Sequence, residues 1–188
     1  MNRWMTGALA VAVVALSACG PKELPVLTCA GELTGPIEGT FARCSGFDQL
    51  YRQNTDTFSM SVAYNELAAG LTYELSASVE MRGEPEPGRQ QQTSCLATLK
   101  SGKKKYLASV GMGAVSGSCQ VNFSDVVGYP QQGNTISYCV LKGRITARLD
   151  EDPLDATSVP VNLRLDFDYA PAATDPESVN RICGVTTP

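Results

Sequence analysis

The sequence predicts an all-β fold, an antiparallel β-sandwich or barrel of about eight strands that is braced by disulfides. Three observations lead to this prediction. Apolar and polar residues alternate with a period of two, turn residues separate the alternating segments, and an even number of cysteines follows the first 20 residues. The chain of 188 residues shows no internal repeat and no second domain, and its length suffices to bury a core.

Strand-like alternation is clearest in three segments, in which large apolar side chains occupy one face. These segments are residues 57–64, 72–81 and 159–170. Shorter candidates have the same pattern and lie at residues 37–44, 94–100, 105–112, 118–123 and 136–149. No long segment has helical periodicity, and the best helical candidate, residues 47–52, would form only one or two turns.

The cysteines predict three disulfides. Apart from Cys19, the chain contains six cysteines, namely Cys29, Cys44, Cys95, Cys119, Cys139 and Cys183. Six cysteines allow 15 connectivities, among which the sequence does not decide. Our working expectation is sequential pairing, of Cys29 with Cys44, Cys95 with Cys119, and Cys139 with Cys183. Cys95 and Cys119 share the apolar parity of their strands, so their bridge should be buried.

The first 18 residues have the composition of a secretory signal, since Arg3 precedes an uncharged run that is too short to span a bilayer. This run ends in Leu16-Ser17-Ala18-Cys19, which resembles the lipobox of bacterial lipoproteins. The resemblance implies cleavage between Ala18 and Cys19, diacylglycerol on the sulfur of Cys19, and acylation of the new amino terminus. An ordinary signal peptide that releases a soluble protein is the alternative.

The leader divides the chain into three expected parts: a signal peptide at residues 1–18, a membrane tether at 19–28, and one β-domain at 29–188. Cys19 is followed by Gly20 rather than aspartate, which by the same resemblance favours the outer membrane over the inner one. We therefore expect a lipid-anchored protein of the bacterial cell envelope that contacts the membrane through its lipid.

Charge and composition exclude several classes of function. Without the leader the chain has 14 basic and 19 acidic residues, a net charge of −5, so no nucleic-acid partner is expected. The absence of histidine removes the Ser-His-Asp triad, the Cys-His dyad and histidine-based zinc hydrolases. With no CxxC pair either, we expect neither a metal site nor a cofactor.

Ser101-Gly102-Lys103-Lys104 spells S-x-x-K, the nucleophile motif of penicillin-interacting enzymes, but it lies at an evident turn. We interpret it as a lysine-rich hairpin tip that faces water, with contact to an anionic partner as the alternative. The acidic residues Asp150, Glu151, Asp152 and Asp155 could offer oxygens to calcium, although their spacing fits a solvated loop better.

Three hypotheses for function follow. The first is a non-enzymatic envelope lipoprotein with a structural, scaffolding or binding role. The second is a module that binds a glycan or an envelope protein through its long loops, above all the proline-broken segment 83–92, which we expect to be mobile and solvated. The third is an envelope enzyme that works without histidine, through a serine–lysine dyad or a pair of carboxylates.

Overall fold

The computed structural model describes residues 24–68, 71–89, 92–111, 116–129, 133–153, 157–173 and 175–184. The expected signal peptide with Ala18, and the expected lipid attachment site Cys19, lie outside these residues. Within the described ranges, the only helix is too short to cross a membrane.

The all-β prediction is confirmed. The described part of the chain contains twelve strands, and the four without a counterpart among the eight predicted segments are residues 26–34, 46–52, 88–89 and 135–136. The strands are β1 (Val26–Thr34), β2 (Gly39–Phe41), β3 (Gly46–Arg52), β4 (Thr57–Ala68), β5 (Leu71–Arg82), β6 (Gly88–Arg89), β7 (Gln92–Ser101), β8 (Lys104–Val110), β9 (Ser118–Gly128), β10 (Thr135–Ile136), β11 (Tyr138–Asp152) and β12 (Val161–Ala170). One helix, α1 (Pro176–Cys183), follows the last strand and was not predicted.

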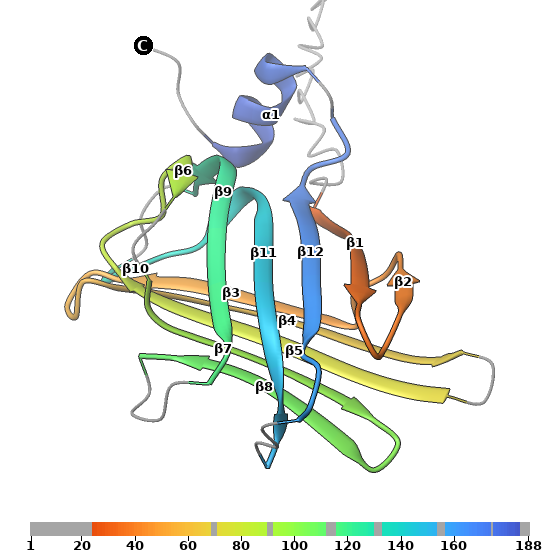
Figure 1. The fold of residues 1–188 in the computed structure, drawn as a ribbon. Coiled ribbons are helices and arrows are strands. Elements are labelled where there is room, and N and C mark those ends of the chain that lie inside the picture. The colour runs from red at the N-terminus through yellow and green to blue at the C-terminus, as the bar shows by residue number, and fades with distance from the viewer. Residues whose placement is uncertain are drawn as a thin grey trace, which may run out of the picture.

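The strands form two layers, each antiparallel, and the strands of one layer cross those of the other at a steep angle (Figure 1). Sheet I has the order β9, β11, β12, β1, β2, with β6 beside β9, and sheet II has the order β8, β7, β5, β4, β3, β10. Strand β11 joins them, because residues 138–148 pair with β9 in sheet I and residues 150–152 pair with β8 in sheet II. One continuous curled sheet therefore encloses the core, as the predicted sandwich requires.

The core is built from the inward positions of both sheets, as the period-two pattern predicts. Phe58 of sheet II packs edge-on against Phe123 of sheet I, with 5.8 Å between ring centres. Phe123 makes the same kind of contact with Phe167. Such pairs add to the apolar area that both layers bury. The crossing of the sheets is thus fixed by side chains that interdigitate between them.

The disulfides pair sequentially, as expected. Cys29–Cys44 holds β1 to the segment that follows β2, and Cys95–Cys119 joins β7 of sheet II to β9 of sheet I. Cys139–Cys183 ties α1 to the start of β11. The Cα atoms of the three pairs are 5.9, 5.7 and 5.6 Å apart. Cys95 and Cys119 are buried, in agreement with their parity in the sequence.

Two local expectations from the sequence differ from the structure. Residues 47–52 are not helical but belong to β3, all seven residues of which pair with β4. A short segment with few apolar residues fits either state, and the neighbouring strand decides. Residues 26–28, which the sequence analysis expected to belong to a tether, lie in β1, which begins at Val26 and pairs with the end of β12.

The core of sheet I should be sensitive to truncation at β11. Ile145 is fully buried, whereas the next residue, Thr146, is exposed on the outer face. We expect Ile145→Ala to reduce the free energy of unfolding by about 2–5 kcal/mol through lost burial and a residual cavity. Thr146→Ala is the matched control and should cost less than about 1 kcal/mol. Urea denaturation measures both values, and equal losses would contradict the assigned facing of β11.

Candidate functional site

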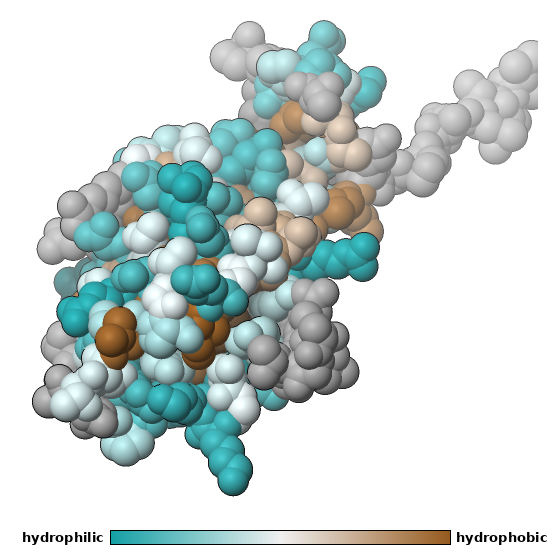
Figure 2. Space-filling model, turned by 45° about the vertical axis from the view of Figure 1, so that its right-hand side comes forward, coloured by the Kyte–Doolittle hydropathy of each residue, from teal (hydrophilic) through white to brown (hydrophobic). Residues whose placement is uncertain are grey.

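A groove of about 680 Å³ lies between α1 and the outer face of sheet I, and it is here called the α1 groove. Its lining is mostly apolar and includes Val26, Val140, Ala170 and Val179. Figure 2 shows apolar surface gathered beneath α1 in the upper part of the view. One ion pair also lines the groove, between Lys142 and Asp168, 3.2 Å apart. The volume is in the range of small-ligand sites, but the groove is open to solvent.

Helix α1 is defined at both ends by its own sequence. Asp175 is the N-cap and accepts a hydrogen bond of 2.8 Å from the backbone N–H of Ser178, which lowers the pKa of the Asp175 carboxyl. Pro176 starts the first turn. Gly184 ends the helix in the left-handed conformation, with φ of 71°. A helix of eight residues is marginal by itself, so these capping signals stabilise α1 only in combination with its packing against the sheet.

The packing of α1 comes from the disulfide at its last residue. Cys183 is buried and bonded to Cys139, and the two cluster with Val140 of β11. Val179 and Tyr129 pack against the same cluster. This small cluster is separate from the main core, so the disulfide is what holds α1 over the sheet and keeps the α1 groove open.

A second hollow, the aromatic cleft, lies between β3 and the α1-proximal ends of β11 and β12 and has a volume of about 530 Å³. It is lined by aromatic rings from four places in the chain, namely Phe47, Tyr129, Tyr138 and Tyr169. The rings of Phe47 and Tyr169 are 5.0 Å apart. Burial raises the pKa of both Tyr129 and Tyr169, so their hydroxyls stay protonated to higher pH than that of an exposed tyrosine.

A polar contact in the aromatic cleft links β3 of sheet II to the start of β11 in sheet I. The side-chain amide of Gln49 donates to the carbonyl of Tyr138 at 3.1 Å and accepts from its N–H at 3.0 Å. The Gln49 side chain thereby makes the two hydrogen bonds that a neighbouring strand would otherwise make with the backbone of Tyr138. Asp48, Ser45 and Ser137 are all exposed, so the cleft offers a carboxylate and two hydroxyls beside the rings.

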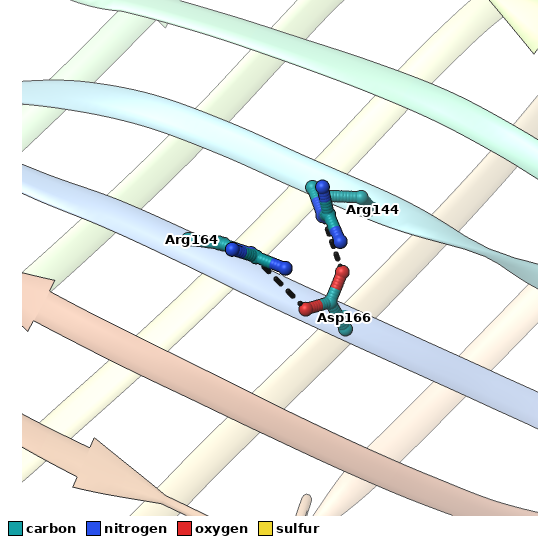
Figure 3. Close-up of polar contacts among 3 residues, drawn as sticks. All are labelled: Arg144, Arg164 and Asp166. Carbon is teal, nitrogen blue, oxygen red and sulfur yellow. Dashed lines mark hydrogen bonds and ion pairs between the residues drawn. The ribbon is translucent and has the colours of Figure 1, made fainter.

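The outer face of sheet I carries a ladder of ion pairs, some between β11 and β12 and one within β12. Arg144 of β11 and Arg164 of β12 both contact the carboxylate of Asp166, as Figure 3 shows. The Nε of Arg164 lies 3.2 Å from that carboxylate. All three side chains are between 41% and 52% exposed, so each pair contributes no more than about 1 kcal/mol. The ladder balances charge on this face and creates no strong field of one sign.

The lysine-rich hairpin tip and the acidic segment of β11 neutralise one another. Lys104 lies 3.0 Å from Glu151, and Lys105 lies 2.8 Å from Asp152. The contact with Glu151 raises the pKa of Lys104, because it favours the charged amine. A lysine that activates a serine needs the opposite shift. The S-x-x-K motif therefore lacks the electrostatics of a serine–lysine dyad, and the predicted basic knob has only part of its charge free.

The carboxylate oxygens that calcium would need are occupied by these ion pairs and by hydrogen bonds. Asp150 accepts a hydrogen bond of 2.7 Å from the N–H of Gly117, and Glu151 accepts one of 2.7 Å from Ser158. Across the described ranges, no group of three or more acidic, cysteine or histidine side chains could hold a metal ion. Asp155, the fourth acidic residue of the predicted loop, lies outside those ranges.

The long polar loop is not the free excursion that we expected. In its described part, residues 83–89, the side chain of Pro85 is buried and Gly88–Arg89 forms β6, which pairs with Asn122 and Phe123 of β9. The loop therefore packs across the sandwich, since its proline and backbone find partners there. Gln90 and Gln91 lie outside the described residues.

No protein family, curated protein or solved structure matches this chain. The site therefore has to be interpreted from its own residues. The sequence analysis missed both hollows because it missed α1 and β3. The signals for α1 were present in Asp175-Pro176 and Gly184, an N-cap followed by proline and a terminal glycine.

The cap at Asp175 should make the first turn of α1 sensitive to acid. A carboxyl with a lowered pKa stabilises the helix above its unfolded pKa, and this contribution is lost as the pH falls through the folded pKa. We expect the amide resonance of Ser178 to move toward its random-coil shift below that pH, while Cys183 stays fixed by its disulfide.

The matched control for this titration is Asp175→Asn, because asparagine caps equally well and does not titrate in this range. NMR spectra of both proteins between pH 7 and acidic pH measure the effect. If Ser178 responds identically in both, the cap does not act through the carboxylate.

Calcium should leave the stability of the protein unchanged, because its candidate oxygens are held by lysines and by hydrogen bonds. We expect the same Tm in calcium chloride and in chelator. A ligand that binds the folded state raises Tm with its concentration. A Tm that climbs steadily with calcium would therefore contradict the assignment of these acids to ion pairs.

Proposed function

We propose that the protein is a membrane-anchored lipoprotein of the bacterial envelope, with lipid on Cys19, an outer-membrane location and a non-enzymatic binding or scaffolding role. The observation that carries this proposal is the sequence Leu16-Ser17-Ala18-Cys19 placed only seven residues before Val26, where β1 begins. Three disulfides in the domain fit an oxidising compartment outside the cytoplasm.

A lipid on Cys19 would hold the domain close to the bilayer. Seven residues span at most about 25 Å when extended. Two or three acyl chains give stable anchoring, whereas a single chain does not. The anchor would therefore confine the domain to the membrane surface, with the start of β1 nearest to it.

The test is incorporation of radiolabelled palmitate during expression in a bacterium with two membranes. Wild type should carry label and fractionate with the outer membrane, and Cys19→Ala should carry none. Ser17→Ala is the matched control, because it keeps a small residue before the cut and should remain labelled. Label on Cys19→Ala, or none on wild type, would overturn the proposal.

Glycan binding is the second candidate function, and the aromatic cleft favours it. Sugar rings pack on aromatic faces while their hydroxyls bind carboxylates and hydroxyls, and the cleft combines Phe47, Tyr129 and Tyr169 with Asp48. This location differs from the long loops that the sequence suggested, because the described part of the loop 83–92 is packed.

Titration calorimetry with soluble peptidoglycan fragments tests the second candidate. Tyr129→Ala should weaken binding by about tenfold, the loss of one aromatic contact. Tyr73→Ala removes a half-buried tyrosine on β5 outside the cleft and should leave the affinity unchanged. Equal affinities of the two variants would place the ligand elsewhere.

A further inference from the structure

We propose that the α1 end of the sandwich rests on the bilayer, with Leu24, Val26 and the apolar lining of the α1 groove in contact with lipid. The inference rests on the proposed anchor at Cys19 and goes beyond it, because an anchor alone would leave the domain free to tumble. It assigns an orientation and a partner, a lipid surface of low charge.

The first evidence is the exposure of large apolar side chains. Leu24 is 72% exposed and Val26 is 58% exposed, and they lie two residues apart at the start of β1. Among the described residues, the third large apolar side chain of this kind is Val159, 61% exposed. Val159 precedes the start of β12, whereas Val26 pairs with Ala170 at the end of β12. Two of the three therefore gather at one end of the molecule.

The second evidence is that the apolar surface continues from Val26 into the α1 groove. Val26 itself lines the groove, together with Ala170, Pro171 and Ala172 of the segment that leads to α1. The charged groups on the lining include Lys142 and Asp168, which form an ion pair, and Asp125, an exposed carboxylate of β9. The ion pair can lie against lipid without leaving a charge unpaired, whereas Asp125 has to stay at the level of the headgroups, in contact with water.

The third evidence is the length and position of the tether. The anchor lies within about 25 Å of Val26, so the patch is the part of the domain held nearest to the membrane. Tethering makes even weak contact effective, because the local lipid concentration is high. The net charge of −5 without the leader disfavours anionic lipid and points to apolar contact with zwitterionic lipid.

The chain offers a clean reporter for this contact. Its one tryptophan, Trp4, lies in the leader, so the mature protein would contain none. Leu24→Trp and Val26→Trp place a single fluorophore at the α1 end, and Val159→Trp places one at the opposite end as the matched control. Leu24 precedes β1, so its substitution leaves every strand intact.

The experiment uses the full lipidated protein in phosphatidylcholine vesicles, with and without bromine on the acyl chains. We expect bromine to quench most of the emission of Leu24→Trp and Val26→Trp, with a shift to shorter wavelength, and to leave Val159→Trp unchanged. Equal, weak quenching at all three positions would overturn the orientation.

Intact mass of the same samples separates this inference from the proposed function. If Cys19 carries lipid and quenching is weak at Leu24 and Val26, the anchor stands and the membrane contact fails. If Cys19 carries no lipid, the anchor fails and the orientation fails with it.

Discussion

Strand β11 constrains the whole sandwich, because it belongs to both sheets. Its 15 residues pair with β9 and β12 and then, in the last three, with β8. Within sheet I, Gly143 permits a shift in the register of β11 with β9, since a Cβ there would overlap the carbonyl oxygen of Asn122 and the ring of Phe167. The crossing of the layers and the enclosed core both follow from the passage of β11 from sheet I into sheet II between Arg148 and Asp150.

The disulfides add covalent links to those made by β11. One links the two sheets through Cys95 and Cys119, and another holds α1 to the start of β11. In the chain-entropy account, disulfides that close loops of 24 and 44 residues each raise the free energy of unfolding by about 3–4 kcal/mol. The main core is large, so these bridges supplement packing in the sandwich. They matter most at α1, whose own cluster is small.

Much of the fold could be predicted because burial leaves a local trace. Strands with one buried face, such as β4, β5 and β12, alternate visibly, and the parity of Cys95 and Cys119 predicted a bridge in the core. The sequence did not predict strand β3, because its seven residues have mixed polarity and become a strand by pairing with β4. The start of β1 was predicted too late in the chain, because two prolines before Val26 are typical of a linker.

The site was predictable only in part, because its contacts are non-local. Lys105 and Asp152 are 47 residues apart and each suggested a charged loop, whereas together they form an ion pair. The aromatic cleft likewise combines rings from β3, β11 and β12 that no local pattern connects. Sequence supplied the anchor hypothesis, and the structure supplied the surface that such an anchor would hold against the membrane.

Intact mass spectrometry of the protein from its native membrane, with thiols alkylated before and after reduction, tests the account most directly. The account predicts a chain that begins at Cys19, carries acyl groups, and takes up alkyl groups on six cysteines only after reduction. A chain without lipid, or cysteines that react before reduction, would contradict a lipid-anchored domain braced by three disulfides.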